Sequence, residues 1–373
     1  MPERTDVSII GGGVIGCSIA YQLAKRGIKC TVFEQNRFAS GASGVTAGMI
    51  SPLWHVNHDN EALFELGMIG LDAFPKLALE LTEAGIDPEF RQSGIIKVAM
   101  NSEEVEILKS DLIWQGEIGI GVRWLDTSEA IDLIPELNPE IKGAVFSPTE
   151  GHVRGQRLVD SLVHAASQLG ATFHEGDEVT ALEIEGNRVK GVRTQHQIHH
   201  SEHTVLAAGP WTGLVGRWLP ETVLPVRPVK GQRLLLRKRG FLPSVIVHSF
   251  MGTTVPQTDG TVLTAATRHE GEFDQEVTVD AIMGITANAT TILPTLKDAA
   301  FVGAMAGVRP GSPDDVPIIG PVPGWSGISL ASGHDGTGIM LSPGTAKLMA
   351  DYICTGDSNP LKPFSLSRFG VQT

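Results

Sequence analysis

This chain of 373 residues lacks the features that tie a protein to an oxidising compartment or a membrane. Its three cysteines, Cys17, Cys30 and Cys354, form no C-x-x-C pair, which excludes a disulfide framework and predicts free thiols. Its apolar stretch 7–20 contains four glycines and is too short to span a bilayer. A strand predicted from about Thr5 leaves no room for a signal peptide. Together these absences predict a cytoplasmic protein without a membrane span.

Basic residues are also scarce. The 29 Lys and Arg stand against 42 Asp and Glu, which gives a net charge of −13. Such a balance argues against nucleic acid and against anionic membrane surfaces as partners. With 42% apolar and 19% charged residues the composition is that of a globular protein, and the length suits about two domains.

A glycine-rich turn follows the first predicted strand and opens a helix. Gly11, Gly13 and Gly16 have G-x-G-x-x-G spacing, and Glu34 ends the next predicted strand. In such a unit the first glycine permits a tight turn, the second lets a pyrophosphate approach the backbone, and the third lets the helix pack on the strand. The Glu34 carboxylate suits ribose hydroxyls and would repel a 2′-phosphate. The unit therefore predicts an adenine dinucleotide site.

Two further segments of small residues favour a flavin over a nicotinamide dinucleotide. The loop 40–49 follows Glu34 closely, so its backbone N–H groups can reach the pyrophosphate and the reactive ring. The turn 333–338 precedes a helix whose N-terminus carries partial positive charge, which stabilises a reduced flavin. Taken alone, the loop is also compatible with a flexible surface loop, and the turn with a structural connection.

Apolar spacing outlines the rest of the chain. It predicts helices at 13–27, 60–83, 102–116, 127–134, 155–169 and 277–293, strands at 28–33, 94–100, 143–147, 171–174, 204–208 and 328–331, a hairpin at 179–194 and a β-rich stretch at 223–267. The fold class that follows is α/β: one discontinuous Rossmann-like nucleotide domain and a second, β-rich α+β domain.

In their order along the chain, these motifs resemble those of glycine oxidases. The segments that carry the resemblance are 11–16, Glu34, 41–49, 207–211, 228–231, 308–310 and 333–338. Glycine oxidases belong to the D-amino-acid oxidase family of FAD enzymes, which includes sarcosine oxidases and D-hydroxyproline dehydrogenases. The resemblance implies an FAD-binding domain at 1–86, 148–222 and 302–373, and a substrate-binding domain at 87–147 and 223–301.

The resemblance also implies the site residues, with FAD bound non-covalently. The expected FAD-binding residues are Gly11, Gly13, Val14, Ile15, Gly16, Glu34, Gln35, Ala42, Ser43, Ala47, Gly48, Met49, Val179, Gly209, His334, Asp335, Gly336, Thr337, Gly338, Ile339 and Met340. The expected substrate-binding residues are Arg309, Thr253 and Met251. Arg309, beside a predicted strand, suits a substrate carboxylate. No catalytic side chain is assigned, because the flavin carries the chemistry.

The chain departs from glycine oxidases at the carboxylate clamp. Thr253 stands where they place a tyrosine, and Gly336 replaces a second arginine. The only tyrosines, Tyr21 and Tyr352, fall in predicted helices of the cofactor domain. We therefore expect a roomier pocket, and a preferred substrate other than glycine.

The expected activity is FAD-dependent oxidative deamination of a small amino acid or N-substituted amino acid of the glycine, sarcosine or D-amino acid type. Hydride passes from the α-carbon to flavin N5, and the imine hydrolyses to a 2-oxo acid. O2 or another acceptor then takes the electrons, and the resemblance implies a homo-oligomer. The alternative is a flavin amino acid dehydrogenase of the D-hydroxyproline type, which passes electrons to a quinone or a partner subunit. A nicotinamide dehydrogenase and a non-enzymatic flavin subunit are the other classes considered.

Several histidines suggest other roles. His196, His199, His200 and His203 resemble a metal site, but strand spacing divides them between two faces, so we expect no metal. Trp54, His55 and His58 follow the predicted flavin loop. They are compatible with a lid over the substrate or with a surface turn.

Overall fold

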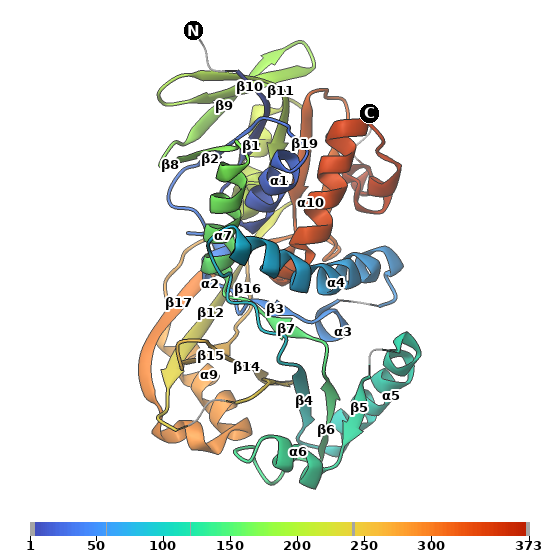
Figure 1. The fold of residues 1–373 in the computed structure, drawn as a ribbon, viewed down its shortest axis with the longest axis vertical. Helices are drawn as coiled ribbons and strands as arrows, with labels where there is room; N and C mark the ends of the chain where they lie inside the picture. Colours follow the sequence, from blue (N-terminus) through green and yellow to red (C-terminus); the bar gives the residue numbers. More distant parts are fainter. Residues whose placement is uncertain (1–3, 57, 120, 241–242, 371–373) are drawn as a thin grey trace.

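Two β-sheets dominate the computed structural model, which describes residues 4–56, 58–119, 121–240 and 243–370 (Figure 1). The first sheet contains β1 (Arg4–Ile10), β2 (Cys30–Glu34), β8 (Thr172–Glu175), β9 (Val179–Glu185), β10 (Arg188–Thr194), β11 (Ile198–Leu206), β18 (Ile318–Pro321) and β19 (Ile328–Ser332). The second contains β4 (Ile95–Ala99), β5 (Arg123–Leu125), β6 (Gly143–Ser147), β12 (Arg227–Arg237), β13 (Ile246–Ser249), β14 (Gly252–Pro256), β15 (Val262–Ala265), β16 (His269–Glu270) and β17 (Ala300–Gly311). A short pair, β3 (Met49–Ile50) and β7 (Gly151–His152), lies between them.

The helices are α1 (Val14–Ala24), α2 (Ala42–Val45), α3 (Pro52–His55), α4 (Glu61–Glu83), α5 (Ser102–Ile118), α6 (Thr127–Leu133), α7 (Gly155–Gln168), α8 (Thr212–Val215), α9 (Val279–Ile292) and α10 (Gly338–Thr355). The longer helices lie close to where the sequence predicts, whereas the short helices α2, α3 and α8 were not predicted. Local chemistry sets several ends. The Asn60 side chain caps α4 by accepting a hydrogen bond from Leu63 N at 3.1 Å, and Asp126 and Glu129 form a capping box on α6.

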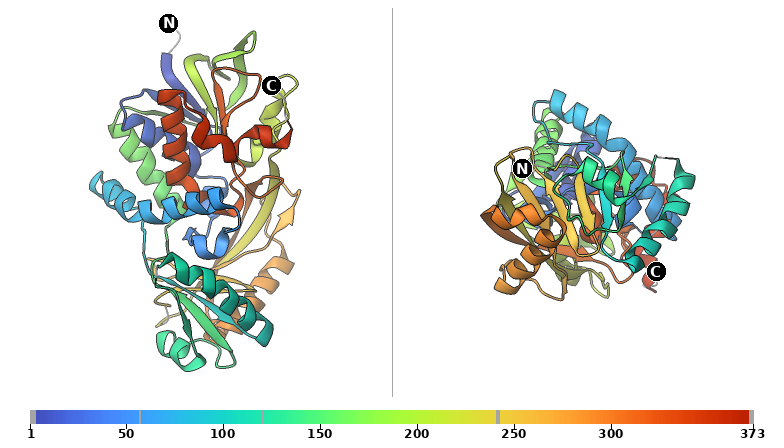
Figure 2. Two further views of the ribbon diagram at one scale, coloured as in Figure 1. Left: turned by 90° about the vertical axis from the view of Figure 1, so that its right-hand side faces the viewer. Right: turned by 90° about the horizontal axis from the view of Figure 1, so that it is seen from below.

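The first sheet has the Rossmann-like arrangement that the sequence predicts. Its order is β18-β19-β11-β1-β2-β8, and β1 pairs in parallel with both β2 and β11. The helices α1, α7 and α10 lie side by side on one face, where their apolar residues form a core with those of α4 (Figures 1 and 2). The hairpin β9–β10 extends the sheet through β11. The α/β fold class is therefore confirmed.

The second sheet has a covered face and a face toward the first half of the molecule. Its order is β16-β12-β15-β14-β13-β4-β6-β5, with β17 on β12. Apolar residues of α6 and α9 pack on the covered face. On the other face, Ile246, Val255 and Leu263 pack against Ala47 and Met49 of the first half.

The sheets divide the chain much as the expected domain ranges do. Every described strand of the first sheet falls within 1–86, 148–222 or 302–373. Strands of the second sheet fall within 87–147 or 223–301, except that β17 continues to Gly311. Residues 1–3 and 371–373, at the ends of these ranges, lie outside the described residues. The domain boundaries remain predictions.

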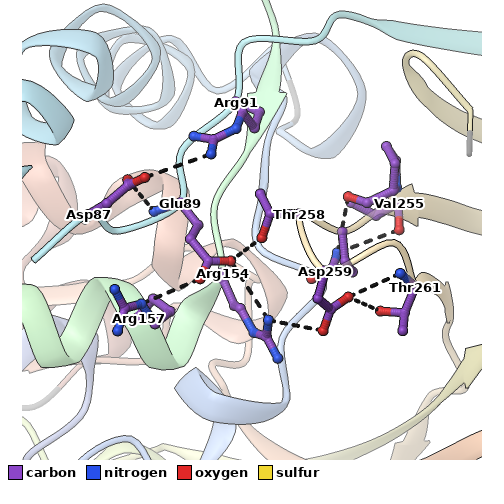
Figure 3. A network of polar contacts seen from close by, with 11 residues as sticks. Asp87, Glu89, Arg91, Arg154, Arg157, Val255, Thr258, Asp259 and Thr261 are labelled. Atoms are coloured by element: carbon purple, nitrogen blue, oxygen red, sulfur yellow. Dashed lines mark hydrogen bonds and ion pairs between the residues drawn. The ribbon is translucent and has the colours of Figure 1, made fainter.

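An ion-pair network joins the two halves beside α7 (Figure 3). Arg154, just before α7, pairs through Nη1 with Asp259 Oδ2 at 3.2 Å and with Glu89 Oε2 at 3.7 Å. Arg157 Nε lies 3.4 Å from Glu89 Oε1. Asp259 belongs to the turn between β14 and β15, so the network connects this turn to the helix of the other half. Partly exposed pairs of this kind contribute about 1 kcal/mol or less each.

Candidate active site

The glycines between β1 and α1 bring three segments of backbone into contact. Gly11 has φ +115°, and a Cβ there would lie 2.3 Å from Ala207 O, so only glycine fits. Gly13 caps α1, and Val14 N donates to Ser43 Oγ at 3.0 Å. A Cβ on Gly16 would lie 2.1 Å from Gly11 O, so this glycine allows the helix to pack on the turn.

Glu34 ends β2 beside this turn. Its Oε2 accepts from Gly12 N at 2.8 Å and its Oε1 from Asn36 N at 2.9 Å, which holds the carboxylate in one orientation. Burial raises the pKa of Glu34, and these two N–H groups oppose the shift. A carboxylate offers about four acceptor positions, so it can still accept hydrogen bonds from ribose hydroxyls.

The loop 40–49 is packed against α7. A Cβ on Gly155 would lie 2.1 Å from Ser43 O, and a Cβ on Gly48 would lie 1.8 Å from Val153 O. Gly48 also has φ +72°. The small residues of this loop therefore serve close backbone contact rather than flexibility.

The segment between β19 and α10 forms the opposite wall. His334 is buried, its Nε2 lies 3.0 Å from Thr345 Oγ1, and burial lowers its pKa to about 3, so the ring is neutral. His334 Nδ1 and Asp335 Oδ1 are buried atoms without hydrogen-bond partners among the described residues. Such atoms suit a site that a polar ligand completes.

These walls enclose a cavity of about 900 Å³. All but one of the sequence-predicted site residues line it: Gly11, Gly13, Val14, Ile15, Glu34, Gln35, Ala42, Ser43, Ala47, Gly48, Met49, Val179, Gly209, Met251, Thr253, Arg309, His334, Asp335, Gly336, Thr337, Gly338, Ile339 and Met340. Gly16 is absent from the lining, and its place is the contact between α1 and the turn. One continuous space thus joins the dinucleotide segments to the second sheet.

Arg309 lies on β17 at the wall of this cavity. Its Nη1 and Nη2 donate to Thr267 O at 3.3 and 3.4 Å, and it has no carboxylate within ion-pair distance in the described part of the chain. A Cβ on Gly231 would lie 2.2 Å from Arg309 Nη2, so the guanidinium rests directly on the β12 backbone. Burial lowers the pKa of Arg309, with Asp335 opposing the shift, and the side chain remains a cation.

A second arginine of the cavity, Arg268, is already paired. Its Nη1 donates to Asp335 Oδ2 at 2.5 Å, and its Nη2 lies 3.4 Å from Glu270 Oε1 and 3.6 Å from Asp315 Oδ1. Arg268 belongs to no motif, so the sequence alone does not predict it as a site residue. These acids offset its charge, so Arg309 is a better anchor for an anion than Arg268.

Two histidines that the sequence reasoning did not assign complete the far end of the cavity. His248 on β13 and His55 on α3 both line it, with ring centroids 5.1 Å apart. His248 Nδ1 lies 2.7 Å from Thr253 Oγ1, and His55 Nδ1 lies 2.7 Å from Ser51 Oγ. His55 thus lines the cavity from the end of α3, with its side chain exposed.

A buried polar cluster supports α3 from behind. Glu150 is fully buried, its Oε1 accepts from Leu53 N at 3.2 Å, and burial raises its pKa to about 8. Lys97 Nζ lies 4.9 Å from the Trp54 ring centroid and 4.7 Å from that of Phe250, and burial lowers its pKa. The cluster places a cation close to the histidine end of the cavity.

The other sequence features carry no site. No group of three or more His, Cys, Asp or Glu suited to a metal ion occurs among the residues that the structure describes. His199 instead packs edge-on against Phe33, and His203 Nε2 lies 2.6 Å from Ser329 Oγ. Within the described ranges, no helix combines the length and apolarity that a membrane crossing needs.

Fold and cavity together fit a protein that binds an adenine dinucleotide. The family model described as FAD dependent oxidoreductase matches residues 6–352, and the chain belongs to this family. Among curated proteins it is 34% identical over 373 residues to a glycine oxidase of Geobacillus kaustophilus (strain HTA426), covering 99% of this chain and 98% of the relative.

Two solved structures resemble this chain over nearly its whole length. The crystal structure of glycine oxidase from Geobacillus kaustophilus superposes with a TM-score of 0.92 at 32% identity, over 98% of this chain and 99% of that one. L-proline dehydrogenase from P. horikoshii superposes with a TM-score of 0.90 at 26% identity, over 99% of both chains. The cofactor of this chain is FAD. The residues present fit it, because the glycine turns leave room for a dinucleotide and the unpartnered atoms at 334–335 await polar contacts.

Proposed function

We propose that this protein oxidises the C–N bond of a small amino acid or N-substituted amino acid to an imine, which water hydrolyses to a 2-oxo acid. The observation that carries the proposal is Arg309. It is a cation without a carboxylate partner among the described residues, in the wall of the cavity that the dinucleotide segments share. A site of this kind suits a substrate that brings its own carboxylate.

The chain contributes binding, orientation and electrostatics. FAD, when bound, supplies the ring that accepts hydride from the substrate α-carbon. Arg309, held by Thr267 O and by contact with the Gly231 backbone, would fix the carboxylate and so orient the α-carbon. The N-terminus of α10, which begins at Gly338 in the cavity wall, would offset negative charge that develops nearby.

The proposed roles of the lining residues follow the same division. Glu34 would accept the ribose hydroxyls, and the backbone at 11–14 and 42–49 would hold the pyrophosphate. Residues 334–340 would border the flavin ring. Thr253 and Met251 would contact the substrate at the second sheet.

The test is anaerobic. Purified protein that carries FAD is mixed with glycine, sarcosine, D-alanine, D-proline or bulkier N-alkyl glycines, and loss of the visible absorption of oxidised flavin is followed. Reduction by at least one of these compounds supports the proposal. If none reduces the flavin, or if 2-hydroxy acids without nitrogen do so equally well, the proposal fails.

A dehydrogenase is the second candidate, favoured by the similarity to L-proline dehydrogenase at a TM-score of 0.90. The two candidates differ only in the electron acceptor. Stoichiometric peroxide from the reduced enzyme in air would establish an oxidase. Slow reaction with O2 and fast reaction with a soluble quinone would establish a dehydrogenase.

A further inference from the structure

The cavity extends from Arg309 across the second sheet to His248. Strand order places Arg309 on β17, Thr253 three strands away on β14, and His248 one strand further on β13. Thr253 is in register with Ala265, Arg233 and Met305, and Arg309 follows Met305 by four residues. In a regular sheet this separates the Arg309 and Thr253 backbones by roughly 14 Å across the strands and roughly 13 Å along them. The Arg309 side chain spans part of this distance, because its guanidinium donates to Thr267 O, two residues beyond Ala265. A carboxylate held there leaves room for a substituent that points toward Thr253 and His248.

The far end of the cavity is polar. Thr253 and His248 share a hydrogen bond of 2.7 Å, and the His55 ring lies 5.1 Å from that of His248. All three residues line the cavity, so their surfaces are accessible from it although protein atoms surround the rings. An apolar group in this space would displace water from imidazole and hydroxyl groups without replacing its hydrogen bonds.

The charges nearby restrict the ligand further. Burial lowers the pKa of His55 to about 4 and that of His248 well below its usual value, and Lys97 adds to both shifts. Both rings are therefore neutral near neutral pH. The charged groups near this end are Lys97 on β4, with Asp111, Glu104 and Glu150 acting on it, and Arg233 on β12, which lines the cavity in register with Thr253. The cations Lys97 and Arg233 disfavour a positively charged ligand group here.

We propose that His248, Thr253 and His55 form a second substrate subsite, which binds an uncharged hydrogen-bonding group or an anionic group on the side chain or N-substituent of the amino acid. The proposal rests on the proposed function and names its substrate class. Arg309 anchors the carboxylate, and the distal polar group lies between the imidazoles. His248 and Thr253 are positioning residues that set specificity.

A second cavity provides a rival location for the substituent. It measures about 250 Å³, lies beneath α9, and shares Met251, Gly252, Thr253 and residues 265–268 with the main cavity. Gly284 of α9 lines it, and a Cβ there would meet no atom within 4 Å. The experiment therefore includes a variant that fills this second space.

The test uses substrate pairs that have equal numbers of heavy atoms and differ in one polar group. D-homoserine is compared with D-norvaline, and N-(2-hydroxyethyl)glycine with N-propylglycine. The rate and saturation of anaerobic flavin reduction are measured for the FAD-loaded wild type. We expect the hydroxyl-bearing member of at least one pair to be favoured by roughly tenfold or more in reduction rate over saturation constant, because the apolar member leaves buried polar groups unpaired.

Variants then locate the effect. For each pair, the ratio compared is the reduction rate over saturation constant of the hydroxyl-bearing member divided by that of the apolar member. His248→Phe and Thr253→Val should each lower this ratio at least severalfold, while His248→Gln should retain most of it. His196→Phe is the matched control, because His196 lies exposed in the turn between β10 and β11 and should leave the ratio unchanged. Thr253→Val keeps the side-chain shape, so it remains informative if His248→Phe does not fold.

Three results would overturn the inference. One is equal reaction of both members of both pairs with the wild type, which leaves the proposed function standing. Another is an unchanged ratio in both His248→Phe and Thr253→Val. The third is loss of the ratio in Gly284→Leu but not in the His248 and Thr253 variants, which would place the substituent beneath α9.

Discussion

The proposed cofactor end and the proposed substrate end of the cavity differ in the groups that line them, backbone at the first and side chains at the second. The cofactor end is mainly backbone, held close by glycines such as Gly11 and Gly48, where a Cβ would collide with a carbonyl oxygen. The substrate end consists of side chains from strands and a short helix, including Arg309, Thr253, His248 and His55. A site made of backbone N–H groups needs glycines at fixed spacing along the chain, which leaves a motif in the sequence. A site made of side chains needs only that distant strands and helices pack together, which leaves no motif.

The largest expected effect is at the backbone end. Gly11→Ala places a Cβ 2.3 Å from Ala207 O at φ +115°, so we expect the purified protein to lose its flavin and at least about 3 kcal/mol of stability. Flavin absorbance per protein and thermal unfolding measure the two effects. The matched control is Gly27→Ala, where φ is +75° but no atom lies within 4 Å. It should cost about 1 kcal/mol and retain flavin. Equal behaviour of both variants would contradict the argument.

Arg309→Met tests the side-chain end. Removal of the charged partner of a substrate carboxylate should cost about 3 kcal/mol, which lowers kcat/KM roughly a hundredfold. Steady-state kinetics on the best amino acid substrate measures it, with flavin content expected to stay unchanged. Arg237→Met, an exposed arginine at the end of β12, is the control. A kcat/KM close to that of the wild type would remove Arg309 from the proposed site.

Glu34→Gln should have a smaller effect, confined to the cofactor. The carboxylate accepts from Gly12 N and Asn36 N, and an amide loses part of this capacity together with the bond to ribose. We expect roughly tenfold weaker FAD binding, or about 1.4 kcal/mol, by titration of the apoprotein. Because burial raises the pKa of Glu34, wild-type affinity should fall as pH falls through that pKa. Equal affinity of Glu34→Gln and of exposed Glu185→Gln would contradict this role.

The last expected effect concerns the pH dependence of stability, through Glu150 behind the histidines. Its pKa rises from 4.5 to about 8 on folding, so the folded state holds a proton that the unfolded state releases. The contribution of Glu150 to the free energy of unfolding is therefore greatest below pH 4.5, its unfolded pKa. It is lost as pH rises toward about 8, its folded pKa. Thermal unfolding between about pH 5 and about pH 9 should show this decline in the wild type and a flatter profile in Glu150→Gln. Exposed Glu140→Gln should follow the wild type, and an identical slope in Glu150→Gln would exclude the mechanism.

The contrast between backbone and side-chain ends also explains how much of the fold and the site could be predicted from the sequence. Residues 11–49 and 333–340 carry a recognisable local order, because strand, turn and helix follow one another at fixed spacing. The contacts that require Gly11 and Gly48, with Ala207 O and Val153 O, come from distant segments. Asn60 and the spacing after it likewise predict α4 from its cap onward. The resemblance then supplied Arg309, whose position on β17 agrees with a strand-borne anchor.

The substrate end could not be predicted from local patterns. For residues 223–267 the sequence predicts only a β-rich segment. The alternation of apolar and polar residues does not specify which strands pair or in what register. His248 meets Thr253 because β13 pairs with β14, and it meets His55 because α3 packs on that sheet. Lys97 and Glu150 are 53 positions apart and unremarkable in sequence. Their environment comes entirely from packing around α3.

The position of the segment 333–340 has a consequence for biosynthesis. The cavity takes its first walls from residues 10–49, but this last wall follows β19 late in the chain. A nascent chain that has reached only α9 therefore presents the turns proposed to bind ribose and pyrophosphate without the wall proposed to border the flavin ring. Capture of FAD must then await the emergence of α10 from the ribosome. Translation products that stop before β19 should accumulate without cofactor, because they lack both that wall and β19, the strand between β11 and β18 in the first sheet.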